Sequence, residues 1–255
     1  MNIARSSNPV LSKTAFNSRS YATTYTETMT LNGTINKSVA MLLLVIVGAL
    51  YTWNMFFGAT NIETGSALVS KWIAIGGIGG FIAALITIFK RSWAYITAPI
   101  YAVLEGLFLG AISAFFEASY PGIVIQAIAL TFGTMFILLI GYRTGVIKVT
   151  KKFRAGVIAA TGAVALVYFI SIILSLFGVN NLIIHSNGIL GIGISLVIVG
   201  IAALNLVLDF DFIAKGSEAG LPKYMEWYAA FGLMVTLIWL YIELLRLLSK
   251  FASRD

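Results

Sequence analysis

Several kinds of residue are scarce in this chain of 255 residues, and each scarcity excludes a class of protein or site. It has no cysteine, which excludes disulfide bonds and thiolate metal sites, and its single histidine, His185, leaves little scope for zinc or haem. Only 11% of the residues are charged, whereas 59% are hydrophobic. Soluble domains are about half apolar and about a quarter charged, so a water-soluble protein is excluded.

The few charges are mostly basic, and their placement indicates membrane topology. The net charge is +7, but the Lys and Arg residues lie in short segments between apolar runs, so we expect no nucleic-acid partner. Residues 1–38 are polar and hold no apolar run, which predicts a flexible cytoplasmic tail and no secretory signal peptide. The basic bias of this tail leaves a mitochondrial transit peptide open as an alternative.

Long apolar runs are abundant, and a transmembrane helix needs about 20 such residues. We count seven runs of that kind and predict an all-α integral membrane protein, a bundle of seven transmembrane helices in the lipid bilayer. The bundle occupies residues 39–248, and a short tail follows at 249–255. The predicted spans are 39–57, 72–89, 95–116, 123–142, 155–177, 189–208 and 224–248.

Basic residues alternate between the connections of these spans. They follow the second, fourth and sixth spans, whereas the connections after the first and third spans carry Glu63 and Glu117 and the one after the fifth carries no charge. Because Lys and Arg are retained on the cytoplasmic side, this alternation predicts a cytoplasmic N-terminus. We expect the membrane to be the cytoplasmic (inner) one. Lys250, after the seventh span, breaks the rule and leaves a re-entrant seventh segment open.

Glycines recur at spacings that suit helix contacts in lipid. Gly106, Gly110 and Ala114 form a ladder of small residues in the third span, and further glycines crowd the second and sixth spans. Lipid supplies no hydrophobic drive between helices, so close backbone approach is what stabilises their contacts. We therefore expect these faces to be packing faces.

Five acidic residues lie inside the predicted spans or at their ends, where an ionised carboxylate is costly unless it faces the bundle interior, a partner or water. They are Glu105, Asp209, Asp211, Glu226 and Glu243. Glu105 lies deep in the third span without a cation in that span, so both a protonated, hydrogen-bonded carboxyl and a cation ligand fit it. Glu226 lies near the start of the seventh span, where stabilisation by the helix dipole is the leading interpretation.

Asp209 and Glu243 are the strongest candidates for ion binding or pH sensing. Asn205 lies one helical turn before Asp209 on the same face, which predicts a polar stripe inside the bundle. Asp211 points elsewhere and is expected at the membrane interface. Glu243 lies one turn before Arg246, so a local ion pair that merely neutralises both is the alternative for this acid.

Two carboxyl groups that meet in a low dielectric cannot both ionise cheaply, so they titrate as a unit. An Asp209 and Glu243 pair would respond to protons and would offer a weak calcium site, because calcium prefers about six to eight oxygen ligands. The residues alone leave open whether the two meet. Asp209 and Asp211 share one helix end and are not placed as a catalytic pair, and nucleophile motifs are absent, so we expect no enzymatic activity and no cofactor.

Four segments carry a resemblance to a known family. They are SSNPVLS in the tail, TFGTMFILLIGYRTGVIKVTKKF around the fourth span, LNLVLDFDFI at the end of the sixth and LIWLYIELLRLL in the seventh. On these segments the chain resembles the Bax inhibitor-1/YccA family, the transmembrane Bax inhibitor motif proteins, in its bacterial branch. The likeness extends over residues 36–250.

The resemblance implies a seven-helix fold and a pH-sensitive calcium leak that is gated by an acidic pair between the sixth and seventh helices. It places this pair at Asp209 and Glu243. Some members carry a Glu and an Arg in the second helix that bond to the pair, and this chain lacks both, so we expect Glu105 or Arg246 to substitute. Other bacterial members imply the alternative function, an interaction protein that restrains a membrane protease or regulates a stress response.

Overall fold

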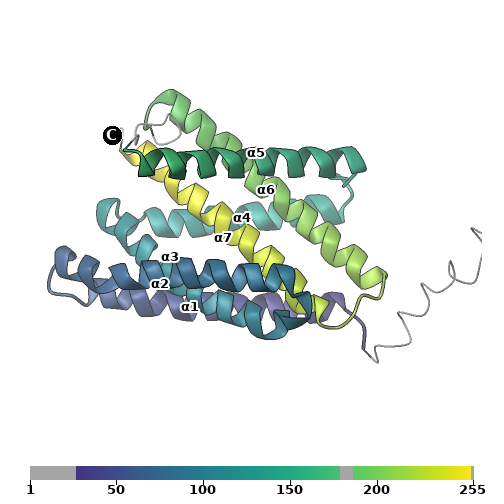
Figure 1. The fold of residues 1–255 in the computed structure, drawn as a ribbon. Helices are drawn as coiled ribbons and strands as arrows, with labels where there is room; N and C mark the ends of the chain where they lie inside the picture. Colours follow the sequence, from purple (N-terminus) through teal and green to yellow (C-terminus); the bar gives the residue numbers. More distant parts are fainter. Residues whose placement is uncertain (1–26, 179–185, 254–255) are drawn as a thin grey trace, which may run out of the picture.

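The chain forms a bundle of long helices, seen here in a computed structural model that describes residues 27–178 and 186–253. The elements are α1 (Leu31–Phe57), α2 (Ile62–Phe89), the short 3-10 turn η3 (Arg91–Trp93), α3 (Ala94–Ser119), α4 (Ile123–Arg143), α5 (Lys151–Leu176), α6 (Ile189–Glu218) and α7 (Met225–Ala252). Seven of them are long and apolar enough to cross a membrane, which confirms the predicted bundle (Figure 1). Residues 1–26 of the predicted tail, and His185, lie outside the described residues.

The helices are longer than the apolar runs that predicted them. α1 starts at Leu31 and not at residue 39, α2 starts at Ile62 and not at 72, and α6 continues to Glu218. Hydropathy detects the part of a helix that lies in hydrocarbon, whereas the backbone hydrogen bonds continue until a cap ends them. Thr30 and Asn61 are such caps, since the side chain of each accepts a hydrogen bond from a backbone N–H of the first turn. The N-terminal tail therefore ends before Leu31.

α1 and α3 touch through their backbones, because glycine removes the side chain at each point of contact. A Cβ atom at Gly106 would lie 2.4 Å from the carbonyl oxygen of Val45, and one at Gly110 would lie 2.1 Å from that of Ala49. Gly76 of α2 faces the backbone of α3 in the same way. The predicted packing faces of the second and third spans are thus confirmed.

The glycines of α6 behave differently. Nothing lies within 4 Å of a Cβ atom placed at Gly193 or Gly200, so the predicted packing role of the sixth span is wrong at these positions. Both glycines are exposed, so they lie on a face of α6 that no other described helix covers.

α7 is the central helix and crosses the whole bundle (Figure 1). It packs against α1, α3, α4 and α6. Its far end reaches the start of α6, where the Lys250 ammonium donates to the Gly191 carbonyl at 3.0 Å and to Ser195 Oγ at 2.8 Å. A re-entrant seventh segment is therefore wrong. Because the Lys250 ammonium is held inside the protein, its charge does not indicate on which side of the membrane α7 ends.

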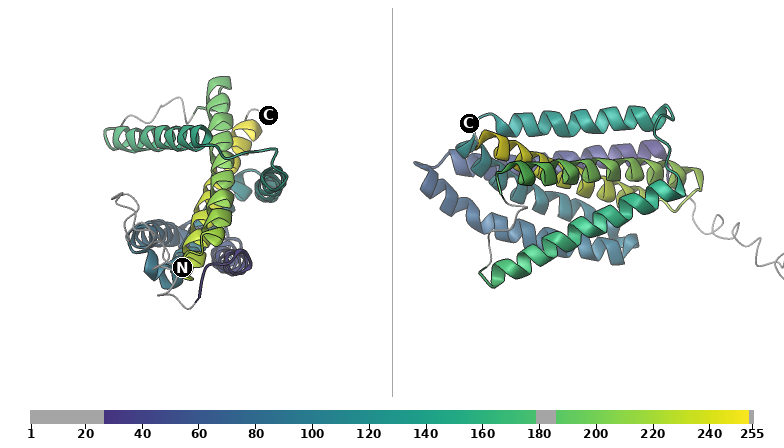
Figure 2. Two further views of the ribbon diagram at one scale, coloured as in Figure 1. Left: turned by 90° about the vertical axis from the view of Figure 1, so that its right-hand side faces the viewer. Right: turned by 90° about the horizontal axis from the view of Figure 1, so that it is seen from above.

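α5 lies on the outside of the bundle and crosses it obliquely (Figure 2). It packs chiefly against α6. Its apolar contact is small: Val164 packs against Ile198, with Tyr168 and Trp239 beside them. Apolar packing alone therefore holds α5 weakly, and polar contacts must contribute.

Candidate functional site

Asp209 lies between α6 and α7 and faces small residues. A Cβ atom at Gly232 would lie 3.8 Å from Asp209 Oδ1. Thr236, one turn further along α7, lies beside the carboxyl group, and its hydroxyl donates to the Gly232 carbonyl at 3.3 Å. The second oxygen, Oδ2, is buried and has no hydrogen-bond partner among the described residues. Burying a carboxylate oxygen without a hydrogen-bond partner costs free energy, so binding a proton or a cation would stabilise this group.

The structure does not bring Asp209 and Glu243 together. The rise along α7 from Gly232, beside Asp209, to Glu243 is about 16 Å. α6 and α7 are antiparallel, so two acids near the C-terminal parts of their helices separate along the membrane normal. On α7, Asp209 lies beside Gly232 and Thr236. The expected acidic pair, and the weak calcium site that needed both carboxyls, are therefore not formed.

Glu243, Asn205 and Asp211 instead anchor α5. Arg154, Thr161 and Tyr168 follow one another at intervals of seven residues and therefore lie on one face of α5. Each of them contacts α6 or α7. We call this row the α5 seam. Its three ties are Arg154 to Asp211, Thr161 to the Asn205 amide at 2.7 Å, and Tyr168 to Glu243 at 2.8 Å.

The first tie of the seam lies near the ends of α4 and α6. Asp211 is only 3% exposed. It forms ion pairs with Arg154 and, at 2.7 Å, with Lys215, and the Tyr142 hydroxyl donates to it at 3.4 Å. Asp211 was expected at the membrane interface, and in the structure its side chain is buried near the end of α6. Each of its carboxylate oxygens is ion-paired with a basic side chain.

The middle tie belongs to Asn205. Its amide nitrogen donates to Thr161 of α5 and to the carbonyl of Ile201, at 2.7 and 2.9 Å. The predicted polar stripe of Asn205 and Asp209 thus divides: Asn205 faces α5, whereas Asp209 faces α7.

The third tie surrounds one oxygen of Glu243, a residue that is 1% exposed. Glu243 Oε1 accepts hydrogen bonds from Tyr168 Oη at 2.8 Å, Trp239 Nε1 at 3.2 Å and Arg246 Nη1 at 3.4 Å. The local ion pair of Glu243 and Arg246 is therefore present, but as part of a network that reaches α5. Arg246 also donates to Tyr168 Oη at 3.0 Å and lies over its ring.

The remaining two acids lie apart from these sites. Glu105 packs between α2 and α3, where a Cβ atom at Gly80 would lie 2.9 Å from its Oε1. It joins neither Asp209 nor Glu243, so it does not substitute for the missing second-helix residues. Arg246 does bond to Glu243, although not to Asp209.

Glu226 ties the start of α7 to the start of α1. It is 0% exposed and accepts hydrogen bonds from the backbone N–H and the hydroxyl of Thr30, both at 2.9 Å. Lys37 of α1 forms an ion pair with the same carboxylate. Glu226 does lie in the first turn of α7, but its partners on α1 explain its burial better than the helix dipole does.

Several functional residues escaped the sequence analysis because their partners are distant in the chain. Thr236 and Lys37 carry no signal of their own. The exception is the spacing of Arg154, Thr161 and Tyr168, since polar residues repeated at seven positions on an apolar helix predict a polar face.

Replacing Tyr168 with Phe should weaken the third tie of the α5 seam, the contact between Tyr168 and Glu243. We expect Tyr168→Phe to lower the free energy of unfolding by about 1 kcal/mol, because Glu243 loses one of three donors and keeps the others. Amide hydrogen exchange in α5 should rise. Tyr95→Phe, at a residue that is 55% exposed, is the matched control and should change neither quantity; equal effects in both variants would argue against the seam.

A search among curated proteins and among solved structures found no match. The sequence model of the family described as Bax inhibitor 1 like matches residues 8–253. This match covers all seven apolar helices and both termini of the bundle. The chain therefore belongs to the Bax inhibitor 1 like family of multi-pass membrane proteins.

Proposed function

We propose that this protein is a proton-responsive calcium leak of the cytoplasmic membrane, and that Asp209 is the charge met by the permeating cation. The observation that carries the proposal is the buried, unpartnered Oδ2 of Asp209 between α6 and α7. Carboxylate oxygens are the hard ligands that calcium prefers. A site with a single acid binds calcium weakly, which suits passage because an ion must leave as readily as it enters.

The described conformation is a closed one under this proposal. Ile213 and Ala229 belong to an apolar cluster toward the N-terminal end of α7, and Leu206 and Leu240 belong to another on the opposite side of Asp209. Flux therefore requires α6 and α7 to separate. A proton on Asp209 removes the charge that attracts the cation and favours the closed packing, so the leak should increase as pH rises through the titration of Asp209.

The orientation that we propose keeps the N-terminus in the cytoplasm. The ends of α4 and α6 and the start of α5 carry Arg143, Lys215 and Lys151. Basic residues are retained on the cytoplasmic side, so this end of the bundle would face the cytoplasm, and calcium would enter from the other.

Asp209→Asn tests the proposal directly. In liposomes loaded with a calcium dye, we expect this variant to reduce flux by about ten-fold, which needs only about 1.4 kcal/mol of lost cation stabilisation. The remaining flux should no longer depend on pH. Glu105→Gln is the matched control, since it neutralises a different intramembrane acid, and it should leave both the rate and the pH dependence unchanged.

Flux that is the same in Asp209→Asn and in the unmodified protein would refute the role of Asp209. No flux in the unmodified protein at any pH, together with a membrane protease that co-purifies in stoichiometric amounts, would instead support the interaction protein that regulates proteolysis.

A further inference from the structure

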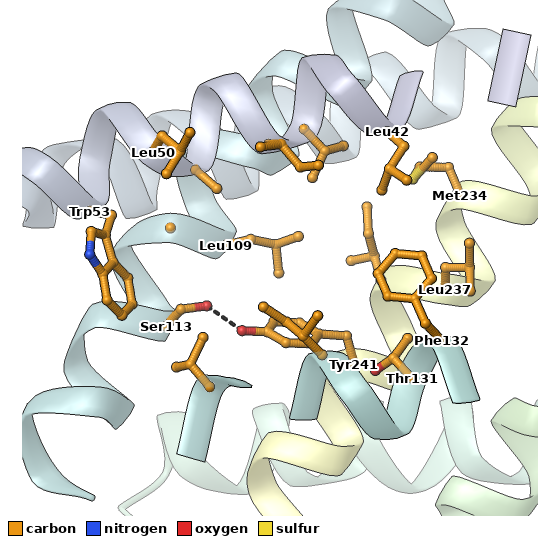
Figure 3. A pocket seen from close by; sticks show the side chains of 17 residues that line it. Leu42, Leu50, Trp53, Leu109, Ser113, Thr131, Phe132, Met234, Leu237 and Tyr241 are labelled. Carbon is orange, nitrogen blue, oxygen red and sulfur yellow. Dashed lines mark hydrogen bonds between the residues drawn. The ribbon is translucent and has the colours of Figure 1, made fainter. Parts of the chain in front are cut away.

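An apolar cavity of about 370 Å³ lies within the membrane part of the bundle, away from Asp209 and the α5 seam. Four helices line it: α1, α3, α4 and α7 (Figure 3). Leu109 of α3 points into its middle (Figure 3). Leu42, Phe132 and Leu237 lie on one side of it, and Leu50 and Trp53 lie on the other (Figure 3). A void of this size forfeits many dispersion contacts if nothing fills it.

Water is a poor occupant of this cavity. A buried water needs about two to four polar partners, and the three hydroxyl groups in the lining are already engaged, which leaves the Trp53 indole N–H alone among the described lining side chains. Ser113 Oγ and Tyr241 Oη are hydrogen-bonded to each other at 2.6 Å (Figure 3), and the Thr131 hydroxyl donates to the Ala127 carbonyl at 2.7 Å. The cavity therefore favours an apolar ligand.

The cavity opens toward the surroundings between α1 and α4. Its lining includes Ile46 and Leu50 of α1 and Ile128 of α4, which are 43%, 53% and 38% exposed. Both views in Figure 2 place α1 and α4 on the same flank, and the view along the bundle shows them apart. In a protein of seven membrane-spanning helices, exposed apolar residues at this depth face the hydrocarbon of the bilayer. The mouth is thus continuous with lipid.

We propose that this cavity binds one acyl chain of a bilayer lipid, which enters between α1 and α4 and ends against the pair of Ser113 and Tyr241. The proposal is independent of calcium flux. The acyl chain fills the space between α1, α4 and α7 at the depth of the cavity, where these helices do not pack directly against one another. The lipid headgroup stays in its leaflet, so the site selects for hydrocarbon and for chain length, not for headgroup charge.

Photolabelling in lipid nanodiscs tests this binding. The probe is a phosphatidylcholine with a diazirine near the methyl end of one acyl chain, and labelled residues are located by peptide mass spectrometry. We expect label on Leu109 and Leu237, which are only 6% and 8% exposed and which lipid at the outer surface cannot reach. Label confined to exposed residues would overturn the proposal.

Filling the cavity provides the second arm of the experiment. Leu109→Trp should reduce labelling of Leu237 by about ten-fold, since the loss of a few buried methylene contacts suffices for that factor. Ile46→Trp, at the mouth, should do the same without disturbing the core, and it covers the case in which Leu109→Trp fails to fold. Ile100→Trp, at a lipid-facing position of α3 that is 48% exposed, is the control and should leave the labelling unchanged. Undiminished labelling of Leu237 in a folded Ile46→Trp variant would contradict entry by this route.

Discussion

Gly110→Ala is expected to lower the free energy of unfolding by about 3 kcal/mol or more, because overpacking at a rigid contact forces the backbone to shift. The added Cβ would lie 2.1 Å from the carbonyl oxygen of Ala49 and 2.3 Å from Thr52 Oγ1. A backbone carbonyl in a helix cannot rotate away as a long side chain can. α1 and α3 must therefore separate, and the contact through which they pack is lost.

Thermal unfolding in detergent or nanodiscs measures this effect. Gly200→Ala on α6 is the matched control, because its Cβ meets nothing within 4 Å and alanine favours the helix over glycine. We expect this control to be neutral or slightly stabilising. If both variants unfold at the same temperature, the close approach of α1 and α3 does not stabilise the protein.

Glu226→Gln is expected to produce the second large effect. The carboxylate is fully buried, and its partner Lys37 has a side chain that is only 20% exposed. Removing one member of a buried pair leaves an uncompensated charge, which typically costs about 3 kcal/mol or more. We expect a loss of stability of that size, together with faster hydrogen exchange at the start of α1.

A double-mutant cycle separates the ion pair from simple damage to the fold. Adding Lys37→Met to Glu226→Gln removes the unpaired ammonium, so the double variant should regain part of the lost stability. Glu63→Gln serves as the control, since Glu63 is an exposed acid in the first turn of α2 and exposed charges contribute at most about 1 kcal/mol. A double variant no more stable than Glu226→Gln would show that Lys37 is not the partner that matters.

The candidate site was only partly predictable, and Glu243 shows why. Its place inside a predicted span indicated an acid that faces the bundle interior, a partner or water, and its spacing from Arg246 offered the local ion pair as the alternative interpretation, which the structure contains. Its contact with Tyr168 of α5 depends on how α5 lies across α6 and α7, which no local pattern encodes. Asp209 was likewise recognised as an intramembrane acid, and the resemblance implied a pair with Glu243, whereas in the structure Asp209 lies beside Gly232 and Thr236 of α7. Register between antiparallel helices decides such pairings.

The sequence by itself determined the seven spans, the all-α class, the packing face of α3 and the family. These features are local: lipid acts as the solvent, so a run of apolar residues must become a helix that satisfies its own backbone, and the glycine ladder of α3 lies where that helix touches α1. Only the tertiary structure decided which acids meet which partners, that α7 is central, and that a cavity opens between α1 and α4. These features depend on the tilt and register of helices that are far apart in the chain. If one helix slid by one turn along its neighbour, each residue at their contact would meet a different partner.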